Sequence, residues 1–337
     1  MRSPTRRGLI QRLIAYPALL LLALAALWAV SIRMPGESFE APLPALTAEQ
    51  SASSEQLRAH VEMLAGRIGE RNYMRLGALD SAATYVHQVF AALGYTVTEQ
   101  TYVAGGKTYR NIEAVLPGRS RAKEIVLVGG HYDSVFDSPG ADDNASGMAS
   151  VLELARLMRS VAGERTLKFV AFANEEPPFF YSDSMGSLVY ARAARARGDD
   201  IVAMLSMETL GYYTDSAGTQ KYPPILGWFY PDRGSYVGVV GNIGSRSLVH
   251  RVIRDFRASA QFPSAGAAAP TQLPGIAWSD HWSFWQAGYD AVMITDTAPF
   301  RNPNYHEISD RPASLDYDRM ARAVHGVAAA VRSLANG

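Results

Sequence analysis

The chain has 337 residues, 48% of them hydrophobic, and its 32 basic and 32 acidic residues give a formal net charge of zero. The balanced charge, without a basic face, argues against a nucleic-acid partner. The absence of cysteine excludes a disulfide scaffold and a thiolate metal site, so a metal ion would have to be held by histidine and carboxylate side chains.

The first 32 residues predict a membrane anchor. Residues 1–12 carry no acidic residue, and 13–32 form an uncharged apolar run. As a helix this run would be about 30 Å long, the thickness of the hydrocarbon core of a bilayer. Since Arg2, Arg6, Arg7 and Arg12 precede it and only Arg33 follows closely, we expect a cytoplasmic N-terminal tail and an extracytoplasmic main domain. A cleaved signal peptide is the alternative and gives the main domain the same location.

The remaining residues are predicted to form a linker over 33–50, rich in Pro, Ala and Glu, and one domain over 51–337. Patterns of apolar residues predict strands at 95–102, 109–116, 124–128, 166–173, 201–207, 237–240 and 291–294. They predict helices at 54–64, 78–93, 146–160, 186–197, 247–258, 281–287 and 313–334. Residues 211–232 and 259–275 are predicted to be loops. The alternation predicts an α/β fold with a mixed, largely parallel central sheet, helices on both faces and ligands at the carboxyl ends of the strands.

Histidine and acidic residues follow several of the predicted strands or lie at loop tips. They are His131, Asp133, Asp142, Asp143, Glu175, Glu176, Glu208 and His306. Each alone is weak evidence, because the two aspartates precede a predicted helix and could cap it, and a Glu-Glu pair is commonly a solvated turn. Together they predict one shared crevice, since the carboxyl ends of parallel strands meet at one edge of the sheet.

Two histidines and three carboxylates are suitable ligands for two divalent ions, one carboxylate bridging both. A water held between such ions loses its proton near neutral pH, and an unligated carboxylate can pass that proton to a leaving amine. This chemistry hydrolyses an amide without a covalent intermediate.

The motifs H-Y-D, P-G-A-D-D-N-A-S-G, N-E-E, M-E-T-L-G and N-Y-H occur in that order between residues 131 and 306. Over residues 55–335 the chain resembles the two-zinc aminopeptidase family of secreted bacterial leucyl aminopeptidases, whose relatives include glutamate carboxypeptidase and glutaminyl cyclases. The resemblance implies a metallopeptidase with two zinc ions per chain that cleaves peptide substrates by a metal-bridged hydroxide.

The resemblance also implies a role for each motif residue. His131 and Glu208 would bind one zinc, Glu176 and His306 the other, and Asp143 would bridge them. Glu175 would be the general base, Asp133 would hold His131, and Tyr305 would donate a hydrogen bond to the oxyanion.

Three positions depart from the family pattern or compete with it. Position 208 is glutamate where the bacterial leucyl enzymes have aspartate, and we expect it still to bind metal. The segment Pro177 to Tyr181 is aromatic instead of glycine-rich, and it could line a specificity pocket or pack in the core. His281, in S-D-H-W, is a possible substitute ligand, although a structural or substrate-facing role is favoured.

The leading interpretation is a membrane-anchored exopeptidase, most simply an aminopeptidase. A cyclase-like acyltransferase with one zinc and an inactive binding domain on the same fold are the alternatives. The sequence leaves open the side-chain specificity, the peptide end that is attacked, the oligomeric state and the choice among zinc, manganese and cobalt.

Overall fold

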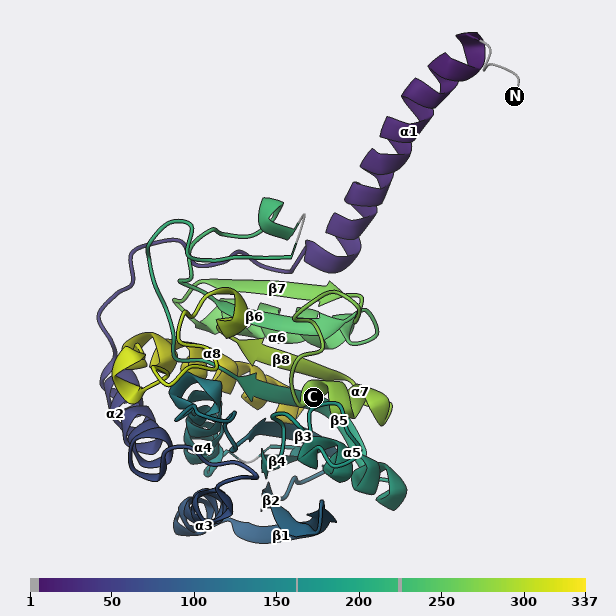
Figure 1. Ribbon diagram of the computed structural model, residues 1–337. Coiled ribbons are helices and arrows are strands. Elements are labelled where there is room, and N and C mark those ends of the chain that lie inside the picture. The colour runs from purple at the N-terminus through teal and green to yellow at the C-terminus, as the bar shows by residue number, and fades with distance from the viewer. Residues whose placement is uncertain (1–5, 162, 224–225) are drawn as a thin grey trace.

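The computed structural model describes residues 6–161, 163–223 and 226–337. The first five residues of the predicted cytoplasmic tail, Arg2 among them, lie outside the described residues. One eight-stranded sheet forms the centre of the domain, in the order β1-β2-β4-β3-β5-β8-β6-β7 (Figure 1). Its strands are β1 (Thr96–Ala104), β2 (Lys107–Leu116), β3 (Arg121–His131), β4 (Arg165–Phe172), β5 (Asp200–Glu208), β6 (Val237–Asn242), β7 (Ser264–Ala269) and β8 (Ala291–Thr295).

The four central strands β4, β3, β5 and β8 run parallel to one another. The flanking strands make the sheet mixed, because β2 is antiparallel to β4 and β6 is antiparallel to β8. The carboxyl ends of the four central strands therefore lie side by side, and this edge can collect side chains from distant parts of the chain.

Helices cover both faces of the sheet, as predicted. On one face lie α2 (Ala48–Val61), α3 (Leu76–Ala92), α4 (Gly147–Met158), α6 (Arg246–Ser259) and α8 (Tyr317–Asn336), and on the other lie α5 (Gly186–Arg197) and α7 (His281–Gln286). Alternate residues of β3 enter the two cores, since Val126 and Val128 pack in the first and Ile125 and Leu127 in the second. This alternation follows from the period of two residues in a strand and explains the uninterrupted apolar run.

The strand β7 lies inside the region 259–275 that was predicted to be a loop, so that prediction is wrong for residues 264–269. Its sequence is S-A-G-A-A-A, which lacks the β-branched and aromatic residues that mark strands. The small side chains fit a crowded place, because a Cβ added to Gly266 would lie 2.8 Å from Met34 Cγ. Pairing with β6, from Val237 with Ser264 to Asn242 with Ala269, overrides the weak local preference.

The N-terminal apolar run is a helix that projects from the domain (Figure 1). It consists of α1 (Arg6–Leu27) and a π-helical continuation, Trp28–Ile32. The 22 residues from Gln11 to Ile32 have a mean hydropathy of 2.3, so length and composition suit either a membrane-spanning helix or a signal sequence.

The predicted linker contains no helix or strand from residue 33 to residue 47, and α2 begins at Ala48. The segment lies against the domain instead of standing free. Arg257 Nη1 donates to the carbonyl oxygens of Pro35 at 3.2 Å and Gly36 at 2.7 Å. The backbone N–H of Ser264 donates to Ser38 Oγ at 3.0 Å.

Candidate metal centre

Three neighbouring parallel strands deliver the candidate residues to one place. His131 is the last residue of β3 and Glu208 the last of β5, while Glu175 and Glu176 follow the end of β4. The strand β3 continues through Gly129 and Gly130, three residues past the predicted end at Val128. Glycine is needed at Gly130 because a Cβ there would lie 2.8 Å from the carbonyl oxygen of Met207 on β5.

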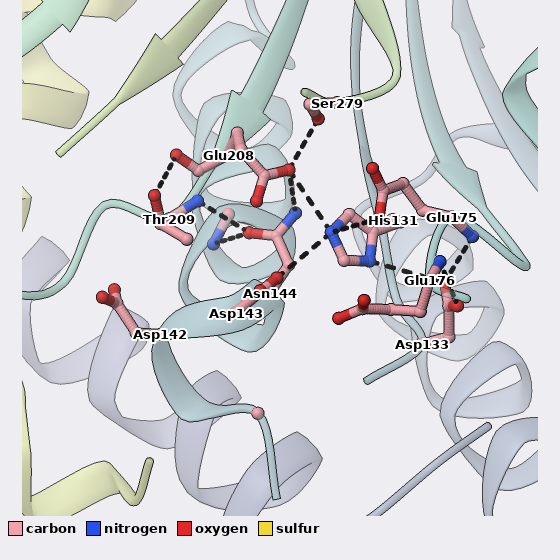
Figure 2. Close-up of polar contacts among 12 residues, drawn as sticks. His131, Asp133, Asp142, Asp143, Asn144, Glu175, Glu176, Glu208, Thr209 and Ser279 are labelled. Carbon is pink, nitrogen blue, oxygen red and sulfur yellow. Dashed lines mark hydrogen bonds and ion pairs between the residues drawn. The ribbon is translucent and has the colours of Figure 1, made fainter. Parts of the chain in front are cut away.

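One group of potential metal ligands consists of His131, Asp143 and Glu208 (Figure 2). His131 Nε2 lies 3.4 Å from Asp143 Oδ1 and 3.3 Å from Glu208 Oε2. All three residues are buried, so a cation between these atoms would be surrounded by protein on most sides.

A second group consists of Asp143, Glu176 and His306. His306 Nε2 lies 3.0 Å from Asp143 Oδ2 and 3.6 Å from Glu176 Oε2. Asp143 belongs to both groups and turns one oxygen toward each histidine. The structure thus brings all five of the predicted ligands together, in two triads that share one carboxylate.

The chemistry of these residues fits divalent cations. Buried charges in proteins are paired or bind metal, yet His131 Nε2, Asp143 Oδ1 and Glu176 Oε1 have no hydrogen-bond partner among the described residues. Burial, followed by repulsion from Asp143 and Glu175, raises the pKa of Glu176 well above its ordinary value. Nitrogen and carboxylate donors in such a cluster are those that zinc prefers when cysteine is absent.

Asp133 connects the ends of β3 and β4. Its Oδ1 accepts the backbone N–H of Glu175 at 3.2 Å and its Oδ2 accepts that of Glu176 at 3.1 Å. The same Oδ1 lies 3.4 Å from His131 Nδ1, on the side of the ring away from the first ligand group. A carboxylate in this position orients the ring and directs Nε2 toward the ligands.

Glu175 lies beside the first ligand group without belonging to either group. Its Oε2 is 3.8 Å from His131 Nε2 (Figure 2). Burial raises the pKa of Glu175 well above its ordinary value; His131 lowers it, while Glu208, Asp280 and Asp143 raise it further. The carboxylate is therefore a strong proton acceptor next to the candidate ligands.

Asp142 and Asp143 have different environments although they are adjacent. Asp142 Oδ1 accepts the N–H of Gly211 at 2.9 Å and its Oδ2 accepts Asn302 Nδ2 at 2.7 Å. Figure 2 shows its carboxylate directed away from His131. The first N–H of α4, that of Gly147, donates to Asn144 Oδ1 at 3.0 Å, so the asparagine fills the helix-capping role considered for the aspartates.

Several further residues support the candidate ligands, and of these Ser279 and Asp310 were not identified from the sequence. Ser279 Oγ donates to Glu208 Oε2 at 2.6 Å, and Asn144 Nδ2 donates to the carbonyl oxygen of Met207 at 3.0 Å. Asp310 accepts the backbone N–H groups of Asp142 at 2.9 Å and Asp143 at 3.1 Å. Ser279 is the first residue of the S-D-H-W motif, two positions before its histidine, so that motif was the available signal for it.

Arg71 is a further residue that the sequence did not reveal. Its guanidinium is fully buried and donates to backbone carbonyl oxygens of the loops around the site. The acceptors are Leu64 at 3.4 Å, Gly69 at 3.1 Å, Tyr132 at 2.7 Å, Pro139 at 2.6 Å and Gly140 at 2.9 Å. Burial lowers the pKa of Arg71 to about 10, so the group remains charged at neutral pH.

His281 is in a structural environment. It is buried, its Nε2 lies 2.8 Å from the carbonyl oxygen of Ile276, and its ring packs edge-on against Trp285.

The aromatic side chains of the segment after Glu176 have different environments. Phe179 packs in the core against Tyr73 and Tyr109, whereas Tyr181 donates to the carbonyl oxygen of Ala277.

A cavity opens beside the two ligand groups. It has about 790 Å³ of free space, its open side included. It extends from Glu208 and Tyr305 over β8, β6 and β7. It lies on the same face of the sheet as α5 and α7, which cover other strands of that face. The wall is mostly aromatic and aliphatic, with Tyr222, Leu226, Tyr230, Tyr236, Trp278 and Phe300. The ring of Tyr305 stacks on that of His306 with centroids 3.9 Å apart.

The sequence is similar to those of known proteins. The chain is 39% identical over 285 residues to the uncharacterized protein YfbL of Escherichia coli (strain K12), covering 82% of this chain and 87% of the relative. It is 26% identical to a probable leucine aminopeptidase of Trichophyton verrucosum (strain HKI 0517), covering 81% of this chain and 71% of the relative.

Solved structures show the same fold at low sequence identity. A zinc aminopeptidase of Bacillus subtilis superimposes with a TM-score of 0.65 at 16% identity, covering 84% of this chain and 95% of the other. A glutaminyl cyclase of Bacteroides thetaiotaomicron superimposes with a TM-score of 0.63 at 16% identity, covering 86% and 99%. The family model described as peptidase family M28 matches residues 111–331. The chain belongs to peptidase family M28.

Proposed function

We propose that the protein is a zinc-dependent aminopeptidase that binds two zinc ions per chain. His131 and Glu208 would hold one ion, Glu176 and His306 the other, and Asp143 would bridge them. The observation that carries this proposal is that Asp143 belongs to two groups of nitrogen and oxygen donors, in which every residue but the half-buried His306 is buried. The similarity to an aminopeptidase from Bacillus subtilis and to a probable fungal leucine aminopeptidase supports the choice of metal and of reaction.

Bound zinc would polarise the scissile carbonyl and lower the pKa of water. Glu175 would accept a proton from the attacking water and deliver it to the leaving amine. Its raised pKa, which follows from burial, suits a group that holds the proton between the two transfers. Asp133 would keep the His131 ring oriented through Nδ1, at 3.4 Å.

Tyr305 would stabilise the negative charge that develops on the carbonyl oxygen. Burial, followed by the charges of Asp143 and Glu176, raises the pKa of Tyr305 well above its ordinary value. The phenol therefore stays protonated and can donate a hydrogen bond in the cavity, whose lining it shares with Glu208.

The cavity supports a preference for a large apolar side chain at the residue that is removed. Its wall is built mainly from aromatic and aliphatic side chains, and the candidate metal ligand Glu208 is part of its lining. An apolar side chain placed there gains roughly 25 cal/mol per Å² of surface removed from water.

The N-terminal helix would anchor the enzyme in a membrane, with residues 1–12 in the cytoplasm and the catalytic domain outside. The apolar run from Gln11 to Ile32 and the basic residues before it support this topology. A cleaved signal peptide remains the alternative. Mass spectrometry of the protein recovered from the membrane fraction distinguishes the two, because only an anchored chain retains α1.

Metal analysis of the purified full chain, paired with a panel of aminoacyl amides and glutaminyl peptides, tests the proposal. We expect about two zinc ions per chain and release of apolar N-terminal residues. The similarity to a glutaminyl cyclase makes cyclase activity the second candidate, and about one zinc with cyclisation of glutaminyl peptides would favour it. Full zinc loading without turnover of any substrate would favour a binding domain.

A further inference from the structure

The foot of the N-terminal helix is bound directly to the catalytic domain. Arg246, at the start of α6, donates through Nε to the carbonyl oxygen of Val30 at 2.7 Å and through Nη2 to that of Ala29 at 3.0 Å. A helix end has unpaired carbonyl groups, and a side chain from the domain satisfies two of them here.

The residues that follow the helix leave no free chain between it and the domain. Ser31, in the last turn of the helix, is buried, and Met34 packs against Gly266 of β7. Arg257 holds the carbonyl groups of Pro35 and Gly36, as described above. The helix therefore leaves the domain at a fixed place.

Three large apolar side chains are exposed around this place. Trp28 is 45% exposed, Ile243 43% and Trp228 76%. They come from the end of the helix, the loop between β6 and α6, and the turn Leu226–Trp228. Ile243 precedes Arg246 by three residues, so it lies beside the foot of the helix.

The segment that follows Trp228 and the residues after the helix both contact β7 at Gly266. Tyr230 OH donates to the carbonyl oxygen of Gly266 at 2.8 Å, and Met34 packs against the same glycine. In Figure 1 this turn lies at the same end of the molecule as α1, beyond β7. Exposed apolar side chains from three separate elements thus lie at the end of the molecule from which α1 projects.

Cationic side chains lie among them. Arg33 is exposed, with its guanidinium carbon 5.7 Å from the ring centroid of Trp28. Arg33 and Arg246 line a hollow next to Ala29 and Met34, together with one acidic residue, Glu37, and with His250, whose pKa burial lowers. Tryptophan and arginine at the end of an apolar helix are typical of the region where a bilayer meets water.

We propose that these five residues, Trp28, Arg33, Trp228, Ile243 and Arg246, form an exit face that rests on the surface of an anionic phospholipid bilayer. The proposal rests on the proposed membrane anchoring by α1, since the bilayer is the one that α1 spans. Apolar side chains would enter the interfacial region and Arg33 would pair with lipid phosphates, while Arg246 holds the helix foot and adds its positive charge to this face. Leu226 and Tyr230 line the cavity beside the metal centre, so the cavity would open next to the lipid surface.

The test uses the full chain in nanodiscs and exploits the absence of cysteine from the sequence. Single cysteines are introduced as Trp228→Cys and Ile243→Cys, with Val103→Cys as the matched control. Val103 is 70% exposed and lies on β1, at the opposite edge of the sheet from β7. Each cysteine carries the same environment-sensitive fluorophore, and the readout is quenching by a lipid with a nitroxide near its headgroup.

We expect at least a several-fold greater quenching constant for the labels at 228 and 243 than for the label at 103. The difference should be larger in nanodiscs that contain phosphatidylglycerol than in pure phosphatidylcholine, and Arg33→Gln should reduce this dependence on lipid charge. Equal quenching at 228 and 103, in chains that co-elute with nanodiscs, would overturn the exit face while leaving the anchor intact. Failure to co-elute would overturn the anchor and the exit face together, and neither result depends on peptidase activity.

Discussion

Replacement of Arg71 by methionine should destabilise the domain more than any exposed substitution. The change removes a buried guanidinium that donates to five backbone carbonyl groups in the segments 64–71 and 132–140. It also removes a positive charge that is attracted to the carboxylates of Asp133, Asp310, Asp143 and Glu176. Methionine is apolar and of similar length, so it would fill the same space. The carbonyl groups would lose their hydrogen-bond donors, and no water molecules would replace them.

The expected magnitude follows from these contacts. A hydrogen bond to a charged group contributes about 1.5–3 kcal/mol, but the five bonds are not additive because the loops relax. Breaking a buried charge site costs about 3–5 kcal/mol, which is a large part of the 5–15 kcal/mol that typically stabilises a domain. At roughly 2–4 °C per kcal/mol, the melting temperature should fall by roughly 6–20 °C.

The assay is thermal unfolding of the full chain in nanodiscs, followed by tryptophan fluorescence. Arg71→Lys keeps the charge but has three N–H donors for five acceptors, so its melting temperature should lie between those of the wild type and Arg71→Met. The control is Arg192→Met, whose side chain is 57% exposed and pairs with the exposed Asp183. Surface pairs of this kind contribute little. If Arg71→Met melted together with the control, the guanidinium would not be what holds these loops.

Further predictions concern the site and the pH dependence of stability. Glu175→Gln should retain zinc and lower kcat by about 10²–10⁴-fold, while the exposed control Glu55→Gln should change neither; unchanged turnover would remove Glu175 as the base. Glu208→Ala should lose one zinc together with activity, and a variant that still binds both ions would exclude Glu208 from the site. Ser279→Ala deletes the 2.6 Å hydrogen bond to Glu208 and should weaken zinc binding by about 10–100-fold, measured by competition with a chelator. Burial, then the charge of Arg156, lowers the pKa of His60 from 6.5 to about 4. The contribution of neutral His60 to stability is complete above pH 6.5 and is lost as the pH falls toward 4, because the unfolded chain binds a proton at this histidine more tightly than the folded chain does. The variant His60→Gln should therefore show a smaller fall in melting temperature between pH 6.5 and pH 4.

The strands that form the site were predictable because their burial leaves a clear trace in the sequence. β3, β4 and β5 each contain an apolar run, and a polar residue that water or a ligand must satisfy stands at the end of the strand or just past it. The parallel arrangement then places His131, Glu175 and Glu208 together without knowledge of any contact. Local pattern and tertiary position agree for these elements.

Other features could not be read from the sequence because their causes lie far along the chain. β7 consists of small residues that pair with β6 and make room for Met34. Arg71 sits in an unremarkable polar stretch, and its acceptors Pro139 and Gly140 are 68 and 69 residues away. Residues 33–47 have the composition of a tether, and they pack on the domain because Arg257, more than 200 positions later, binds their carbonyl groups.

The shared position of Asp143 has a thermodynamic consequence. A single carboxylate that serves both triads cannot adjust to one occupant without affecting the other. Filling either triad would change the affinity of its neighbour, and by reciprocity the same factor applies in both directions. Loading of the protein with cation would then not follow a simple hyperbola, and the singly loaded form would be a distinct species whose abundance reports the coupling free energy between the two positions.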